Sequence, residues 1–519
     1  MELLCACGAS LAVADENARA ILCQKCGASV AVPDAEAANR MLRYVDNPIF
    51  LRSAYARLRP PNAWIWLGIV MLTGFLIVGG AFALSYLLPD GSRELPKHMT
   101  GAFWILFGLQ GLVLLLVGVN SIATGIVTDR ETGVFEMMRL TPLTSWKLLA
   151  GYVLGMPLRE HLWVLVAAPF AGLAVLFGTL PVERVVVLYI VLYAAAVVWH
   201  VFAAFCAIVL KNRRAATSMA VAIPMLLYMF GPCLVAFGTI SLLHLTIYPT
   251  AAWASGETLP RPLTLSMSFY GVPCPFPLFD TIVMLMTASF LWLAALRKFR
   301  SDETPALAKP AGLVYGLLFA VVAFGSFYDG LIISGSGARI AYLLTGFLFI
   351  SILSAMGTPS GDLHGRLVTH ARRVGRTSLG LLGDGSPNLL FVALLLLPFV
   401  ATLLLVPTTA RLADVGLTAS SLLLFALLLQ WCKFAFKRNW PFIFGAALFL
   451  LWGIPIGLAI LCTIASAGHT ATFLAGGLFP GIALGYTDME WAPAVIGLNF
   501  LIATLFGVLA RRASRAAWA

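Results

Sequence analysis

The chain has 519 residues, 60% of them hydrophobic and 11% charged, with a formal net charge of +11 and a mean hydropathy of +0.93. Soluble domains carry roughly 25% charged residues, so this composition excludes a soluble protein and indicates an integral membrane protein. The apolar runs are too long and too continuous for barrel strands, which alternate over about ten residues. Membrane helices are therefore expected.

The first residues contain two cysteine pairs, Cys5 with Cys7 and Cys23 with Cys26, each followed by glycine. Zinc prefers four soft ligands in a tetrahedron, and each pair on a tight turn would supply two thiolates. We therefore expect these four cysteines to hold a structural zinc ion. The alternatives are a pair of disulfides or unrelated thiols, and disulfides would require an oxidising compartment.

Short strands are expected beside these turns, at residues 10–13 and 29–32. Together with the cysteines they resemble a zinc ribbon over residues 3–33, although the first pair is one residue more closely spaced than usual. We predict a small β module at residues 1–33. Its metal would supply its stability, because so short a chain buries little core. A cytoplasmic linker at residues 34–62 would lead to the membrane.

Twelve apolar segments follow, and a helix needs about 20 residues to cross a bilayer. They are Ala63–Leu88, Gly101–Val127, His161–Leu180, Val185–Leu210, Ser218–Leu243, Leu278–Leu296, Ala311–Tyr328, Ile340–Met356, Leu389–Val406, Val415–Cys432, Phe442–Ile464 and Ala492–Leu509. The sequence thus predicts an all-α polytopic membrane protein with about twelve transmembrane helices. Residues 470–486 are apolar but short and interrupted by glycine and proline, so we expect an external re-entrant or interfacial hairpin there.

The distribution of lysine and arginine sets the predicted orientation. With the N-terminus inside, only six of the 34 basic residues fall outside, namely Arg93, Lys97, Arg184, Arg261, Arg339 and Arg411. Cytoplasmic loops are enriched in these residues, so we expect both termini in the cytoplasm and the chain in the cytoplasmic membrane. The positive charge then reflects topology, which argues against a nucleic-acid partner.

The twelve segments divide into two halves of six, at residues 63–300 and 311–519, joined by a linker at residues 301–310. In each half the longest internal loop lies between the second and third segments, at residues 128–160 and 357–388. The shared order of loops suggests two related halves. Internal duplication of this kind is common in transporters.

The first of these loops contains a stretch, residues 129–147, that joins charged residues to an amphipathic turn. Thr141-Pro142 is expected to end that turn, because the residue before a proline disfavours helical backbone. Thr144 or Ser145 is expected to cap the next helix. A helical elbow held at the membrane face between two spans is suited to receive force from a soluble partner.

Catalytic and nucleotide-binding motifs are absent from the sequence. It contains no GxxxxGK[ST] phosphate-binding loop, no HExxH and no GxSxG, so we expect neither an ATPase site nor enzymatic activity in this chain. His200 lies within the fourth span, where we expect a hydrogen bond to a neighbouring helix rather than a ligand or proton relay. Arg159, Glu160 and His161 are expected to form local salt bridges at the interface.

The elbow and its flanks resemble the permease subunits of type-2 ATP-binding-cassette exporters. In that family the elbow reads roughly as acid-Arg-x-x-Gly-x-x-Glu, then Thr-Pro-Leu with Ser or Thr, then a glycine at the start of the third span. The matching residues here are Arg130 and Glu131 in swapped order, Gly133, Glu136, Thr141 and Pro142 within Leu140–Thr144, and Ala150-Gly151. Asn47-Pro48 followed by Arg52 resembles the family's lead-in to the first span, so the resemblance covers about residues 45–300.

This resemblance implies that the chain is the membrane-spanning subunit of an exporter, that a separate ABC ATPase subunit docks on residues 129–147, and that the chain itself binds no nucleotide. The second half departs from the pattern, because residues 357–388 lack the acid-Gly-Glu stretch and are strongly basic. Family permeases usually have six spans and pair as dimers. Twelve spans leave open whether one chain forms the pathway or pairs with a second copy or another permease.

Two other classes of function stay open from the sequence. One is an ion-coupled secondary transporter, and the other is a polytopic membrane enzyme or scaffold. The sequence does not identify a substrate.

Overall fold

The structure is a computed structural model, and it describes residues 2–4, 10–12, 20–22, 26, 29–31, 47–87, 91–141, 143–210, 212–234, 247–255, 266–333, 336–374, 380, 382–386, 388–405, 412–436, 439–454 and 492–518. Within these residues eight helices are long and apolar enough to cross a membrane, or nine if one bent pair forms a single span. This confirms the prediction of a helical, multi-pass membrane protein.

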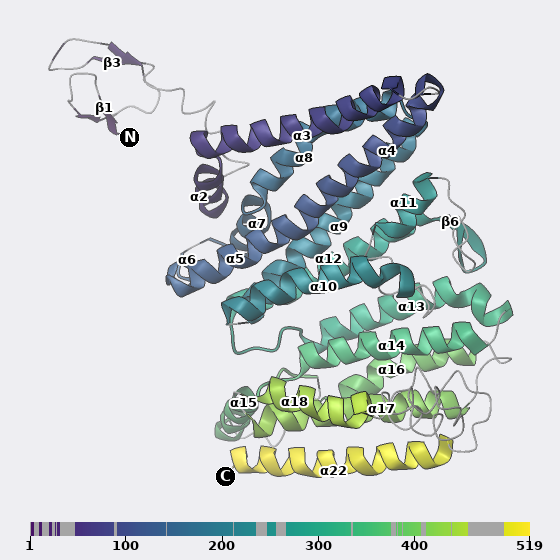
Figure 1. Ribbon diagram of the computed structural model, residues 1–519. Coiled ribbons are helices and arrows are strands. Elements are labelled where there is room, and N and C mark those ends of the chain that lie inside the picture. Colours follow the sequence, from purple (N-terminus) through teal and green to yellow (C-terminus); the bar gives the residue numbers. More distant parts are fainter. Residues whose placement is uncertain are drawn as a thin grey trace.

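The N-terminal half is built from successive helices and one hairpin (Figure 1). Its elements are α2 (Pro48–Arg57), α3 (Pro60–Leu87), α4 (Gly91–Leu112), the π-helical segment η1 (Val113–Val117), α5 (Gly118–Glu131), α6 (Val134–Arg139), α7 (Ser145–Gly155), α8 (Leu158–Leu176), α9 (Val182–Val209), α10 (Arg213–Leu234), α11 (Tyr248–Ser255), β5 (Ser266–Phe269), β6 (Val272–Pro275) and α12 (Phe276–Arg300).

The C-terminal half is also built mainly from helices. Its elements are α13 (Lys309–Ile333), α14 (Ser336–Gly357), α15 (Gly361–Arg373), α16 (Leu389–Leu404), α17 (Leu412–Ala435), α18 (Trp440–Leu448), the π-helical segment η4 (Phe449–Gly453) and α22 (Ala492–Trp518). The bent pair consists of α14 and α15, which meet at 58°.

The count of twelve spans stays a prediction. Each of the twelve apolar segments falls wholly or partly on a described helix, but α16 and the helix through α18 and η4 are shorter than a span. Residues 235–246 and 455–491 lie outside the described residues, and with them the hairpin expected at 470–486.

Two short hairpins lie at the N-terminus. β1 (Glu2–Leu4) pairs antiparallel with β2 (Ser10–Ala12), and β3 (Ala20–Leu22) pairs antiparallel with β4 (Ser29–Ala31). The strands expected at residues 10–13 and 29–32 therefore occur. Along the sequence, one cysteine pair falls between the two strands of each hairpin.

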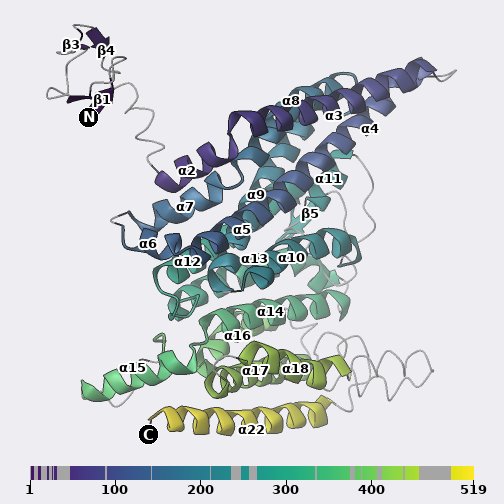
Figure 2. The same cartoon turned by 60° about the vertical axis from the view of Figure 1, so that its left-hand side comes forward.

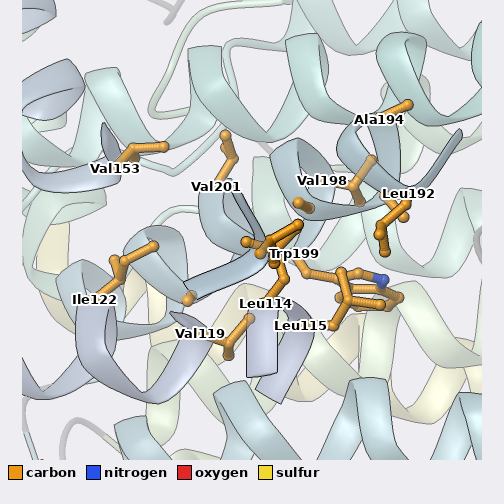
Figure 3. Packing of buried hydrophobic residues seen from close by; sticks show 14 of the residues in the cluster. Leu114, Leu115, Val119, Ile122, Val153, Leu192, Ala194, Val198, Trp199 and Val201 are labelled. Carbon is orange, nitrogen blue, oxygen red and sulfur yellow. The ribbon is translucent and has the colours of Figure 1, made fainter. Parts of the chain in front are cut away.

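Two hydrophobic cores fill the helical body. The first contains buried residues from Ile49 to Phe299, and Figure 3 shows part of it, where Leu115 lies beside the indole of Trp199 of α9. The second runs from Phe279 to Val495. Helix α12 contributes to both, since Met284 and Ala288 belong to the first core and Val283 and Phe290 to the second. The halves predicted to divide after residue 300 thus share α12.

The ends of the helices fall into two groups (Figures 1 and 2). α6, α15 and the C-terminal end of α22 lie at one end of the body, and α11 with the β5–β6 hairpin lies at the other. The helix from Glu94 to Glu131 is continuous over 38 residues. At 1.5 Å per residue it measures roughly 57 Å, against roughly 30 Å for the hydrocarbon core. The helix that leads to α6 is therefore longer than a membrane span.

Candidate coupling elbow

A glycine separates the long second helix from the elbow. α5 ends at Glu131, and Gly133 adopts φ = 77° before α6 begins at Val134. Left-handed backbone costs a residue with a side chain about 1–2 kcal/mol, which glycine avoids. The glycine predicted from the elbow pattern therefore allows α5 to end and α6 to start in a new direction.

The inner side of α6 is organised around Phe135, whose side chain is 0% exposed. Its ring packs against Phe299 of α12 at 4.8 Å and against Tyr152 of α7 at 6.4 Å between centroids. Two guanidinium groups lie over it, those of Arg130 at 5.0 Å and Arg139 at 4.7 Å. Cation–π contacts of this kind contribute about 0.5–2 kcal/mol each, so Phe135 fixes both arginines.

Each of these arginines also binds the end of another helix. Arg139 donates from Nε to Phe299 O at 2.7 Å and from Nη2 to Lys298 O at 3.1 Å, at the C-terminal end of α12. Arg130 donates to Ala207 O and Ile208 O at 3.1 and 2.9 Å, at the end of α9. The last carbonyls of a helix have no partner within it, and they attract cations. The elbow is thereby attached to α9 and α12.

The linker between the two halves takes part in the same network. Asp302 accepts from Arg139 at 2.6 Å and lies 3.7 Å from Arg130. Nothing in the sequence indicated this role, because Asp302 lies about 160 residues from the elbow in a short polar linker. Its contacts join the elbow to the point where one half passes into the other.

A second ionic contact fixes the end of α5 to the helices around it. The buried Asp129 forms an ion pair with Arg52 of α2 and accepts a hydrogen bond from Tyr152 Oη of α7 at 2.8 Å. Burial and the nearby carboxylate raise the pKa of Tyr152 above its ordinary range, so the phenol stays protonated and keeps donating. Three helices thus meet at one carboxylate.

The lead-in to the first span contacts the start of α7. Asn47 caps α2 by accepting from Ile49 N at 3.1 Å, and its amide donates to Lys147 O. A Cβ on Gly151 would lie 2.8 Å from Asn47 Nδ2, and one on Gly155 would lie 2.9 Å from Phe50 Cα. The two short motifs that resemble those of the exporter permeases, Asn47-Pro48 and Ala150-Gly151, therefore lie side by side. Glycines of α7 leave room for α2 where the two helices cross.

The outer side of the elbow is exposed and mixes acidic with apolar groups. Leu140 is 87% exposed and Met137 56%. Glu131 and Glu136 are also exposed; Glu131 lies 3.5 Å from Arg213, and Glu136 accepts from Arg139 at 3.0 Å. An exposed apolar patch with a polar rim is typical of a protein–protein contact.

The residues predicted to form the coupling elbow divide between its exposed outer side and its inner side. Gly133, Glu131 and Glu136 are exposed, whereas Arg130 lies mostly inside, where α9 binds it. Thr141 Oγ1 donates to Met138 O at 2.7 Å at the end of α6, and Pro142 lies outside the described residues. Thr144 caps α7, and it is one of the two residues, Thr144 and Ser145, that were expected to cap this helix.

The corresponding loop of the second half has a different construction. It forms α15, which Ser360 caps, and His364 attaches it to two other segments. His364 Nδ1 donates to Gly385 O at 2.6 Å, and its Nε2 lies 2.8 Å from Ser514 Oγ of α22. Lys433 of α17 donates to Ala355 O and Thr358 O, both at 2.9 Å, at the end of α14. This loop therefore packs on α17 and α22.

The other polar residues considered from the sequence form hydrogen bonds and ion pairs within the protein. His200 Nε2 donates to Leu114 O at 3.0 Å, which confirms the predicted hydrogen bond to a neighbouring helix. Glu160 is buried, accepts from Arg159 at 2.9 Å and lies 3.7 Å from Arg57, which confirms the predicted local salt bridging. Burial lowers the pKa of Arg57 and the Glu160 carboxylate opposes that shift; an arginine remains a cation.

The predicted zinc ligands are described only in part. Cys26 is exposed, in a turn between β3 and β4, and Cys5, Cys7 and Cys23 lie outside the described residues. In the part of the chain that the structure covers, no group of three or more His, Cys, Asp or Glu side chains is placed to hold a metal ion. Zinc binding therefore stays a prediction.

Comparison of the chain with protein families, curated proteins and solved structures finds no match.

Proposed function

We propose that this chain is the membrane-spanning permease subunit of an ABC exporter, and that a separate ATPase subunit drives it by binding the elbow. The observation that carries the proposal is the two-sided construction of residues 129–147. The inner side is attached to α9 and α12 through Arg130, Arg139 and Phe135. The outer side presents Met137, Leu140 and two glutamates.

This construction suits the transfer of force. A displacement of α6 would pull on the ends of α9 and α12 through side chains that are buried or paired. Because α12 belongs to both hydrophobic cores, a movement that begins at the elbow would reach both halves. Interfaces between packed helices shift as units rather than deform continuously.

The proposed orientation places the elbow, α15 and both termini in the cytoplasm, in the cytoplasmic membrane. The clustering of basic residues near these helix ends supports it, with Arg213 at the start of α10 and Arg297 and Arg300 in the last turn of α12. A structural zinc ion on Cys5, Cys7, Cys23 and Cys26 belongs to the same proposal. It is supported by the two hairpins whose strands flank the pairs along the sequence.

The test is capture of the ATPase by the full-length chain in its native membrane. The tagged chain should co-purify with a protein that contains a GxxxxGK[ST] loop and hydrolyses ATP. The double variant Met137→Ser/Leu140→Ser should lower that capture about tenfold, because exposed apolar anchors carry much of the binding energy at an interface. Val374→Ser, which changes a residue 58% exposed beside α15, is the matched control and should leave capture unchanged.

Glu136→Arg tests the charge on the same face. It would place a third cation beside Arg130 and Arg139, and we expect ATPase capture to fall and ATP hydrolysis to lose its dependence on the permease. Equal capture by the wild-type chain and both elbow variants would refute the proposal. Transport that persists without any ATPase but stops when the proton gradient is dissipated would favour the secondary transporter instead.

A further inference from the structure

A groove lies on the outside of the helical body where α3 and α8 begin. Its volume is about 200 Å³. Apolar side chains form most of its wall, and two arginines and two tryptophans complete it: Arg57, Arg159, Trp66 and Trp163. Pockets for drug-sized molecules usually measure about 300–1,000 Å³, so this groove suits part of a chain-like molecule.

The charges at the groove do not cancel. Arg57 and Arg159 both face a single carboxylate, that of Glu160, at 3.7 and 2.9 Å. Their two positive charges therefore leave one uncompensated, and the exposed Arg59 in the turn between α2 and α3 adds another. Among the described residues, the Arg159 guanidinium donates a hydrogen bond to Glu160 alone. A guanidinium has five N–H donors in a fork that matches phosphate oxygens.

The tryptophans beside the groove indicate where its arginines lie relative to the membrane. Trp66 lies over Arg159, with 4.7 Å between the guanidinium carbon and the ring centroid. Trp64 and Trp66 are both exposed on the first turns of α3. Tryptophan side chains concentrate at the level of the lipid headgroups. The arginines thus lie at headgroup level, and the apolar wall continues from them along the spans.

From these observations we infer that the groove between α3 and α8 binds an anionic phospholipid. The phosphate lies against Arg159 and Arg57, and an acyl chain follows Leu67, Leu162 and Val166 along the wall. Charge complementarity selects an anionic headgroup, and the apolar wall favours a lipid over free phosphate. The inference needs only the embedding of α3 and α8 in a membrane and does not depend on an ATPase partner.

The test uses the purified full-length chain, first stripped of lipid and then incubated with phosphatidylglycerol or phosphatidylcholine of identical acyl chains. Bound lipid is counted by native mass spectrometry. We expect the wild-type chain to retain phosphatidylglycerol in preference to phosphatidylcholine. Arg159→Gln should lower retention of phosphatidylglycerol about tenfold, since a charge-assisted hydrogen bond is lost. Arg57 would continue to pair Glu160 in that variant.

Two further variants test whether lipid retention depends on the groove itself or only on the positive charge of the protein. Ala63→Phe fills the groove without changing charge and should lower retention of phosphatidylglycerol by a similar factor. Arg184→Gln removes another arginine that lies over a tryptophan, Trp253 at 5.5 Å, and should leave retention unchanged. Equal retention by the wild type, Arg159→Gln and Ala63→Phe overturns the inference, as does equal retention of both lipids by the wild type. Displacement of the lipid by millimolar inorganic phosphate would show a free-anion site and overturn it too.

Discussion

The two loops that follow the second span of each half differ in how they are attached. The first forms the short helix α6, whose inner side reaches the ends of α9 and α12 through Arg130, Arg139 and Phe135. The second forms the longer, basic helix α15, which His364 attaches to α22 and to the segment around Gly385. Both loops contact α12, the helix shared by both cores: Arg139 of the first binds the carbonyls of Phe299 and Lys298, and Asp384 of the second forms an ion pair with Arg297. The first loop thus binds the last carbonyls of α12 beside a buried ring, whereas the second meets the same helix through the ion pair of Asp384, and the following substitutions test that difference.

The largest expected effect comes from Phe135→Ala. Removal of a buried phenylalanine costs about 3–5 kcal/mol in the free energy of unfolding. Here it also removes the ring over which both guanidinium groups lie and the contact of α6 with Phe299, so stimulation of ATP hydrolysis by the permease should be lost. Phe391→Ala, at an equally buried site in the second core, should cost as much stability and leave that stimulation intact. Thermal unfolding and ATPase assays measure the two properties, and equal loss of stimulation in both variants would contradict the comparison.

A smaller effect is expected from Gly155→Ala, where α2 crosses α7. The new Cβ would lie 2.9 Å from the backbone of Phe50, so α2 must shift, at a cost of about 1–3 kcal/mol. Gly361→Ala in the second loop meets Phe434 Cα at 3.1 Å and should cost less. The control is Gly172→Ala in α8, which has open space around it and should be neutral or slightly stabilising. Thermal unfolding of the three variants ranks them, and a different order would contradict the packing described for α2 and α7.

The smallest effect is expected from Gly133→Ala. Apart from its chain neighbours, no described residue has an atom within 4 Å of the added Cβ, so the cost is that of left-handed backbone, about 1–2 kcal/mol. Gly133→Asn should cost less, because asparagine tolerates this conformation better than alanine. Hydrogen exchange of the α6 amides should quicken more in the alanine variant than in the asparagine variant. Equal exchange in both would mean that the break between α5 and α6 does not depend on the backbone of residue 133.

Local rules were enough to predict much of the elbow. Gly133 and Thr144 occupy the positions expected for them, because positive φ and helix capping depend on only a few neighbouring residues. The same holds for the apolar segments, each of which falls at least partly on a helix, since the length and hydropathy of a span are properties of one stretch of chain.

The sequence alone therefore determined that this is a helical membrane protein, where its apolar helices lie at least in part, and where the polar elbow interrupts them. Only the tertiary structure decided that Arg130 faces inward to α9, that Asp302 joins the elbow to the linker, and that α12 serves both cores. These contacts join residues 77 to 163 positions apart. Hydrophobic periodicity and local propensity carry no information on which helix ends meet, because that depends on how the side chains of all the helices pack together.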